Sequence, residues 1–362
     1  MIGTALLLAT LAIQPQDSPE RVKFEPWTFS APGSTGEEFL IQVPEEKMDQ
    51  PKISPKNKWQ FNWIFPGMAK VPAAPEIYTL RFRTYVQDRS MADDVGPIVT
   101  RMLLQLWGYN VRILKLEHSE RYFRQLVDVY LCTEGKAGGE QLFGEDPTNV
   151  DAQGRPRKSN QIYIYKLETF KNPLERAREV AHEYGHAALP AIGGYKTPEY
   201  WANGNLGEMI YLTWMRNELL SQRMLTIDTL GAKVNELDQY VATKVDPLMV
   251  KAAQTQPSAS VLGKDMNAFL GLASFVHQCF PARVFYRSLL LCGTNGSEYG
   301  TAVKEAAEEL PELTIKVPNS LKGKPIWVPI NSGKIKGYTP IKKVAGWAQI
   351  KPNSATVTIL NP

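Results

Sequence analysis

Two histidines and a glutamate within five residues are the positions of this chain best suited to chemistry. The segment reads His182-Glu183-Tyr184-Gly185-His186, and it holds half of the four histidines in the 362-residue chain. On a helix, residues four positions apart lie on one face, so both imidazoles can bind a single metal ion. The Glu183 carboxylate lies to the side of this pair, where it can act as a general base on metal-bound water. The spacing therefore predicts a catalytic zinc site at His182 and His186.

The residues around this motif predict a helix that follows a strand. β-branched and aromatic residues fill positions 161–165, which is typical of a strand. Asn172 suits the N-cap of a helix, and Pro173 suits its first turn. Pro190 marks the end of the helical pattern. Both histidines should therefore lie inside one helix.

The third metal ligand has to come from a downstream carboxylate. A catalytic zinc usually has three protein ligands and one open position. Ile192 stands six positions after the second histidine, where metzincins have their third one. Glu208 begins another helical pattern and is the preferred ligand, with Glu199 as the alternative. Each has a competing structural explanation: Glu208 could form a capping box with Asn205, and Glu199 could be a first-turn acid after Thr197.

The order of these residues resembles that of the gluzincin metallopeptidases, the zinc enzymes that include thermolysin and the large aminopeptidases. The resemblance covers about residues 75–310. It implies that His182, His186 and Glu208 bind Zn²⁺. It also implies that Glu183 activates water and that a peptide or protein is the substrate. Thermolysin-like sequences have an Asp four residues after the ligand glutamate, which orients a ligand histidine. Leu212 stands there in this chain and leaves that partner unassigned.

His277 is a further candidate catalytic residue. It is the only histidine after Glu208 and lies in a predicted helix. Thermolysin-like enzymes have a downstream histidine that stabilises the oxyanion, so the resemblance gives His277 this role. A packing role is the alternative. Two other functions stay open: a zinc hydrolase with a non-peptide substrate, and a catalytically silent envelope-binding protein with a zincin fold.

The pattern of apolar residues predicts an α+β fold. A zincin-like catalytic domain, with a mixed sheet, the active-site helix and then a helical half, should be followed by a small β-module. The expected regions are a β-rich N-terminal region at 15–73, the catalytic domain at 74–312 and the β-module at 313–362. The predicted strands cover 39–43, 59–65, 78–86, 127–131 and 161–165, and the predicted helices cover 91–109, 205–221, 226–244, 263–279 and 282–292.

The N-terminus and the cysteines bear on where the protein is found. Residues 1–13 form an uncharged apolar run that is too short for a membrane anchor. The run predicts a signal peptide over 1–14 and a secreted or periplasmic protein. Three cysteines give no disulfide framework. Cys279 and Cys292 are a conceivable pair, but buried free thiols are expected because both lie in apolar helical sequence.

The C-terminal segment is strongly basic. Residues 313–362 contain eight lysines and no Arg, Asp or Glu, whereas the net charge of the whole chain is +4. This module could bind an anionic cell-envelope surface, with Trp327, Tyr338 and Trp347 as stacking surfaces. A solvated sheet face packed beside the enzyme is the alternative. Nucleic acid is not an expected partner, because the sequence contains no recognised nucleic-acid-binding module.

Overall fold

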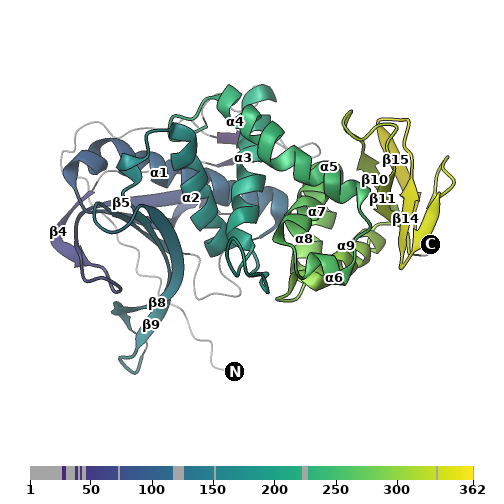
Figure 1. Ribbon diagram of the computed structural model, residues 1–362. Coiled ribbons are helices and arrows are strands. Elements are labelled where there is room, and N and C mark those ends of the chain that lie inside the picture. The colour runs from purple at the N-terminus through teal and green to yellow at the C-terminus, as the bar shows by residue number, and fades with distance from the viewer. Residues whose placement is uncertain are drawn as a thin grey trace.

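A mixed β-sheet occupies one end of the molecule (Figure 1). The computed structural model describes residues 27–29, 37–39, 41–42, 46–71, 74–116, 126–150, 152–221, 227–331 and 333–361. The strands before the helix that carries the His182–His186 motif are β1 (Trp27–Phe29), β2 (Glu37–Phe39), β3 (Ile41–Gln42), β4 (Glu46–Ile53), β5 (Gln60–Val71), β6 (Ala74–Val86), β7 (Val127–Cys132), β8 (Gly138–Val150) and β9 (Pro156–Tyr165). The main sheet has the order β3-β5-β6-β7-β9-β8, with β4 also paired to β5. Strands β6, β7 and β9 are parallel, and β8 runs antiparallel to β9 at the end of the sheet.

Helices cover one face of this sheet and then form the middle of the molecule (Figure 1). Helix α1 packs on β5 and β6, and helix α2 packs on β8 and β9. The Asn160 side chain on β9 donates a hydrogen bond to the Ala187 carbonyl at 2.9 Å, which ties the end of α2 to the sheet. The helices are α1 (Arg89–Tyr109), α2 (Pro173–Ala188), α3 (Asn203–Ser221), α4 (Val234–Tyr240), α5 (Asp246–Gln254), α6 (Ala259–Leu262), α7 (Met266–Cys279), α8 (Ala282–Leu291) and α9 (Tyr299–Glu308).

Two glycines let α2 and α3 approach each other closely. A Cβ atom on Gly207 would lie 2.4 Å from the Cα of Gly185 on the other helix. A Cβ on Gly185 would lie 2.5 Å from the backbone oxygen of Asn203. Side chains at these positions would therefore push the helices apart. The close crossing brings the first two turns of α3 next to the histidines of α2.

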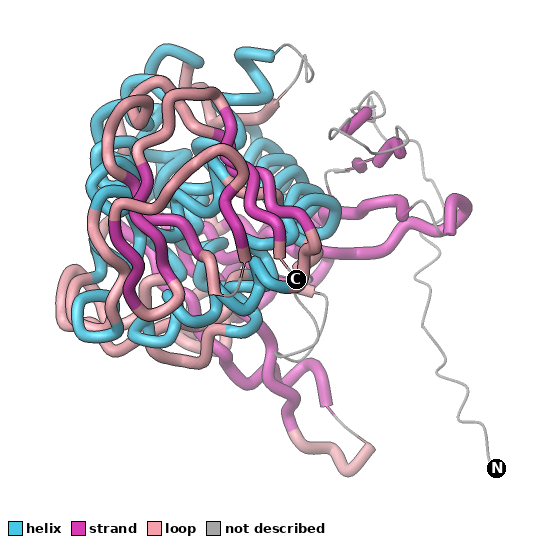
Figure 2. Tube along the Cα trace, turned by 90° about the vertical axis from the view of Figure 1, so that its right-hand side faces the viewer, coloured by secondary structure: helices cyan, strands magenta, loops and turns pink. Residues whose placement is uncertain are grey.

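The C-terminal strands form two small antiparallel sheets at the opposite end of the molecule (Figures 1 and 2). Figure 2 looks at this end and shows the strands in front of the helices. One sheet has the order β10-β15-β12 and the other β11-β14-β13. The strands are β10 (Glu312–Lys316), β11 (Ile326–Pro329), β12 (Lys334–Ile335), β13 (Lys342–Val344), β14 (Trp347–Ile350) and β15 (Thr356–Leu360).

The aromatic residues of this segment correct one expectation. Trp327 and Trp347 are buried, with 5% and 2% of their surface exposed. Trp327 lies on β11, which packs against α5 and α9, and Trp347 lies on β14, which pairs with β11. They are core residues rather than stacking surfaces. Tyr338 is partly exposed, and its hydroxyl lies 2.8 Å from the Ser354 hydroxyl.

The mixed α/β character and the small C-terminal antiparallel sheets agree with the sequence analysis. The expected boundary between residues 73 and 74 falls between β5 and β6, which are paired in one sheet, so β5 is not part of a separate N-terminal region.

The predicted signal peptide at 1–14 lies outside the described residues. Cys279 and Cys292 are buried free thiols, as expected, and so is Cys132. Within the described ranges, no helix combines the length and apolar character needed to cross a bilayer.

Candidate metal centre

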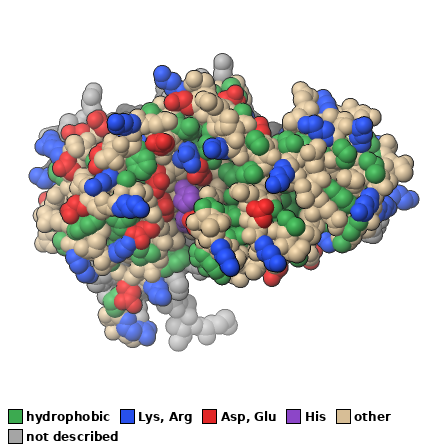
Figure 3. Space-filling model, viewed as in Figure 1, with side chains coloured by type: hydrophobic (Ala, Val, Ile, Leu, Met, Phe, Trp, Pro, Cys, Tyr) green, Lys and Arg blue, Asp and Glu red, His purple; other side chains and the backbone are tan. Residues whose placement is uncertain are grey.

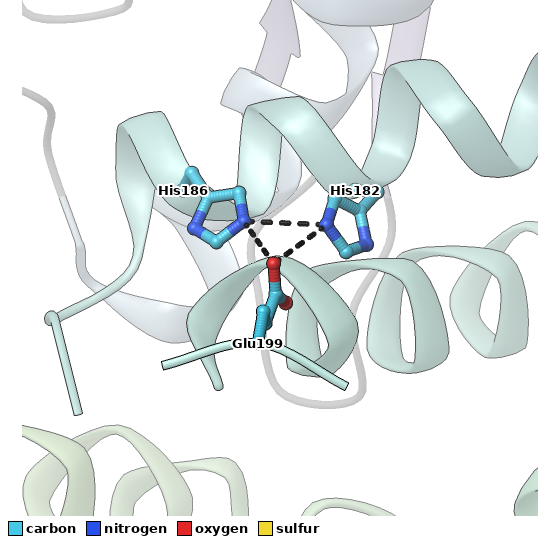
Figure 4. Close-up of side chains that lie close together, drawn as sticks. All are labelled: His182, His186 and Glu199. Atoms are coloured by element: carbon cyan, nitrogen blue, oxygen red, sulfur yellow. Dashed lines mark hydrogen bonds and ion pairs between the residues drawn. The ribbon is translucent and has the colours of Figure 1, made fainter. Parts of the chain in front are cut away.

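Helix α2 carries both histidines of the motif, as the sequence predicts. The Asn172 side chain caps the helix by accepting a hydrogen bond from the Leu174 N–H at 2.9 Å. Pro173 is the first helical residue, where its missing N–H costs nothing. The cap fixes where the helix starts. One helical turn separates His182 from His186, and Figure 4 shows both side chains on the same side of α2.

Three side-chain atoms converge below α2 (Figure 4). The Nε2 atoms of His182 and His186 are 3.2 Å apart. The Oε2 atom of Glu199 lies 3.3 Å from the Nε2 of His186 and 3.5 Å from the Nε2 of His182. All three residues are partly buried. In the space-filling view, histidine side chains are visible at the bottom of a hollow on this face of the molecule (Figure 3).

These separations match what one tetrahedral metal ion requires. Zinc binds imidazole nitrogen and carboxylate oxygen at about 2.0–2.2 Å, so two of its tetrahedral ligand atoms lie roughly 3.3 Å apart. The three separations between the side-chain atoms are within 0.2 Å of this value. Two imidazoles and one carboxylate are also a common donor set of catalytic zinc sites. The residues present therefore fit a Zn²⁺ ion.

Gly204 leaves the space that such an ion needs. This glycine lies in the first turn of α3 and is buried. A Cβ atom there would lie 2.2 Å from the Nε2 of His186 and 2.6 Å from the Nε2 of His182. The first distance is close to a metal–nitrogen bond length, so a side chain at residue 204 would enter the space beside the two Nε2 atoms where an ion would bind. The glycine is thus part of the geometry of the candidate site.

Glu208, the ligand preferred from the sequence, does not point toward the Nε2 atoms of the two histidines. Its Oε2 atom lies 3.7 Å from the Nδ1 of His182, on the opposite side of the imidazole from Nε2. Its Oε1 atom accepts hydrogen bonds from Arg178 Nε at 2.6 Å and from the Tyr240 hydroxyl at 2.8 Å. The geometry therefore favours Glu199 over Glu208 as the third residue of the candidate metal site. Glu208 instead supplies the carboxylate partner of His182, which the sequence left unassigned.

The capping explanations for the two glutamates are not supported either. Helix α3 begins at Asn203, so Asn205 lies inside its first turn, and Glu208 bonds to Arg178 and Tyr240 rather than to its own helix. Glu199 lies in the connection before α3 and not in a helix. Its second oxygen accepts a short hydrogen bond from the Asn205 side chain. This bond holds Glu199 with its Oε2 toward the histidines.

Asn203 is the corresponding partner of His186. The Oδ1 atom of Asn203 lies 2.9 Å from the Nδ1 of His186. The amide nitrogen of Asn203 reaches the carbonyl of His186 at 3.3 Å, so the amide orientation is fixed from both sides. Each imidazole therefore has a partner at Nδ1 that leaves Nε2 for a metal. Sequence reasoning missed Asn203, because its contact depends on the crossing of α2 and α3.

The charged groups around His182 favour positive charge at this site. Burial alone would lower the pKa of His182, but the neighbouring carboxylates of Glu199 and Glu208 outweigh burial and raise the pKa to about 10. Burial would raise the pKa of Glu199, but hydrogen bonds from His182 and His186 lower it to about 2. A metal ion can supply this positive charge in place of an imidazole proton, which is why metal binding at such sites releases protons.

Glu183 lies beside the triad in a dry environment. It is 3% exposed, and its Oε2 atom has no hydrogen-bond partner among the described residues. Burial raises the pKa of Glu183 to about 8, against the opposing effect of His182. Strand β8 packs directly on this side chain, since a Cβ on Gly139 would lie 2.5 Å from the Cγ of Glu183. A buried carboxylate with an open lone pair is suited to exchanging a proton with a bound water.

Replacing Gly204 with alanine is expected to abolish zinc binding while the fold is retained. The added methyl group takes the ion's position, whereas alanine in a helix is more favourable than glycine by about 1 kcal/mol. Zinc affinity can be measured by competition with a chromophoric chelator, and folding by thermal unfolding of the metal-free protein. Parental zinc affinity in this variant would show that the ion binds elsewhere.

His277 is not part of this site. Its Nε2 atom lies 2.5 Å from the hydroxyl of Tyr109, and its ring packs on Phe285 with a centroid distance of 4.9 Å. Burial lowers the pKa of His277 to about 4, so the ring is neutral at physiological pH. The predicted catalytic role is therefore corrected to a packing role. The sequence order suggested otherwise because it does not show that α7 turns this residue toward α1.

Replacing His277 with alanine is expected to leave the catalytic constant unchanged and to reduce stability. The change leaves the buried Tyr109 hydroxyl without its partner, which costs about 1–3 kcal/mol. The free energy of unfolding of His277→Ala can be measured with denaturant. Tyr109→Phe is the comparison variant, because it removes the same hydrogen bond from the other side. A drop in turnover with a parental unfolding curve would restore the catalytic role.

Comparison with known proteins does not assign this chain to a family. No known protein family matches the chain, and no curated protein is significantly similar to it. Conclusions about function therefore depend on the site itself.

Proposed function

We propose that this protein is a zinc-dependent hydrolase of peptide bonds, with His182, His186 and Glu199 as the metal ligands and Glu183 as the base. The observation that supports the proposal most is the convergence of His182 Nε2, His186 Nε2 and Glu199 Oε2 at the separations of zinc ligands. The buried carboxylate of Glu183 beside them supplies the base that hydrolysis requires.

In this proposal the chain's own residues move one proton. A bound Zn²⁺ would lower the pKa of water and polarise the substrate carbonyl. Glu183 takes the proton from the attacking water and then gives it to the leaving amine. Glu208 and Asn203 hold the two imidazoles at Nδ1, and Asn205 holds Glu199. These partners keep the ligands in place, so little reorganisation is needed during the reaction.

The position of β8 favours an extended peptide as the substrate. Within the described part of the chain, β8 pairs only with β9 and forms the end of the sheet. An edge strand offers main-chain donors and acceptors to which an extended peptide can pair. Gly139 on this strand contacts Glu183, so a peptide along β8 would pass close to the base.

Hydrolysis by the purified, zinc-loaded protein tests the proposal. A mixed peptide library should give cleavage products, with one ¹⁸O atom in each new carboxylate when the reaction is run in H₂¹⁸O. A zinc chelator should stop the reaction and added Zn²⁺ should restore it. Turnover of esters or non-peptide amides alone would favour a zinc hydrolase of another substrate class. Stoichiometric zinc without any turnover would favour a catalytically silent binding protein.

We also propose that the C-terminal module attaches a secreted or periplasmic enzyme to an anionic cell-envelope surface. All eight lysines of residues 313–362 are exposed, which leaves their charges available. Attraction of this kind weakens as ionic strength rises. Sedimentation of the protein with anionic envelope material should therefore decrease with added salt.

A further inference from the structure

A carboxylate next to the proposed base has no assigned task. Glu179 lies on α2, one helical turn before Glu183, and is partly buried. Among the described residues, no hydrogen bond or ion pair satisfies its side chain. The adjacent Arg178 donates instead to Glu208 at 2.6 Å. Burial of a carboxylate without a partner is unfavourable, and a cationic group supplied from outside would relieve it.

Glu179 and Glu183 point to the same place on β8. A Cβ atom on Gly139 would lie 2.8 Å from Glu179 Oε1 and 2.8 Å from Glu183 Cδ. Glycine at this position therefore leaves both carboxylates room at the strand edge. The Oε2 atom of Glu183, on a side chain that is 97% buried, is also without a hydrogen-bond partner in the described chain. Two acceptors thus face the side of the site where β8 would align a peptide.

We infer that Glu179 selects substrates that carry an ammonium or guanidinium group next to the scissile bond. The inference depends on the proposed peptidase function. Four helical residues span about 6 Å, which is close to the distance from a peptide carbonyl to the side chain of an adjacent residue. The cation can come from a Lys or Arg side chain or from the substrate's own N-terminal ammonium group. Both sources offer a positively charged hydrogen-bond donor, so the experiment has to distinguish a side-chain cation from the N-terminal one.

Four peptides that share the rest of their sequence distinguish the two sources of the cation. They combine lysine or norleucine beside the cleaved bond with a free or acetylated N-terminus. The zinc-loaded parent should cleave peptides with the preferred cation roughly 10- to 100-fold better in kcat/KM, the range expected for a hydrogen bond to a charged group. In Glu179→Gln this preference should fall to about one, mainly through KM. A preference that follows lysine assigns the side chain, and one lost on acetylation assigns the N-terminus.

Glu175→Gln is the matched control. Glu175 lies one turn further from the base on the same helix and is exposed, so its loss removes equal charge without changing the site. Its preference should equal that of the parent. Cleavage without a charge preference, or with one unchanged in Glu179→Gln, contradicts this inference and leaves the proposed function standing. Absence of any peptide cleavage by the parent contradicts the proposed function and this inference with it.

Discussion

Replacing Glu183 with glutamine is expected to leave zinc bound and to lower turnover by at least about 10²-fold. Glutamine keeps the shape of the side chain but cannot take a proton from water, and loss of a general base costs about 10²- to 10⁴-fold. The metal ligands are unchanged, so zinc should remain at one ion per chain. The fold should also be unaffected, because the carboxylate that is lost is buried without a hydrogen bond at Oε2.

Zinc content by mass spectrometry and the rate of peptide cleavage should be measured on the same preparation of this variant. Glu175→Gln, an exposed change on the same helix, serves as the control and should match the parent in both quantities. Parental turnover in Glu183→Gln would exclude Glu183 as the base. Loss of zinc together with turnover would show instead that this carboxylate holds the metal.

Replacing Glu199 with alanine is expected to weaken zinc binding by more than about 10²-fold. This change removes the Oε2 atom that completes the group of three ligand atoms. Glu208→Ala should have a smaller effect, because Glu208 acts through His182. Loss of such an outer partner typically lowers metal affinity by about 10- to 100-fold.

Zinc titration of Glu199→Ala, Glu208→Ala and Glu208→Gln ranks the two glutamates. Glu208→Gln keeps an oxygen near the Nδ1 of His182 and should retain more affinity than Glu208→Ala. If Glu208→Ala loses more zinc than Glu199→Ala does, the assignment made from the sequence is restored. Unfolding curves are needed in parallel, because Glu208→Ala also removes the partner of Arg178.

Local sequence signals were sufficient to predict helix α2, which carries the two histidines. Asn172 and Pro173 determine its start, and the four-residue spacing of the histidines determines that they share a face. These features depend on neighbours in the chain. The same holds for α1 and α8, whose predicted ranges of 91–109 and 282–292 agree with the structure to within two residues.

The position of Glu199, the proposed third ligand, could not be predicted in this way, because it depends on how the chain returns after α2. The Ala202 N–H bonds to the Ile192 carbonyl at 2.8 Å, and the Tyr195 N–H bonds to the Tyr200 carbonyl at 3.3 Å. These bonds fold the connection back under α2 and place Glu199 below the histidines. The proximity of Glu199 to His186 in sequence was the available signal, and the helical pattern that begins near Glu208 was given more weight.

Strand β8 was also missed, for a different reason. Its sequence starts Gly138-Gly139-Glu140 and includes charged residues, so it lacks the alternation and the β-branched residues that indicate a strand. Pairing with β9 forms it nevertheless. The glycine that weakens the strand signal is the residue that gives Glu179 and Glu183 their space. The strand thus departs from the usual sequence pattern of strands at Gly139, a residue next to the proposed base.

Anomalous diffraction at the zinc edge, from crystals of the zinc-loaded protein, tests the central claim most directly. We expect one strong peak in contact with His182 Nε2, His186 Nε2 and Glu199 Oε2, at about 2.0–2.2 Å from each. Glu208 should lie outside the coordination sphere, at the Nδ1 side of His182. A peak bound by Glu208 would contradict the ligand assignment, and the absence of any peak between the two histidines would contradict the metal centre itself.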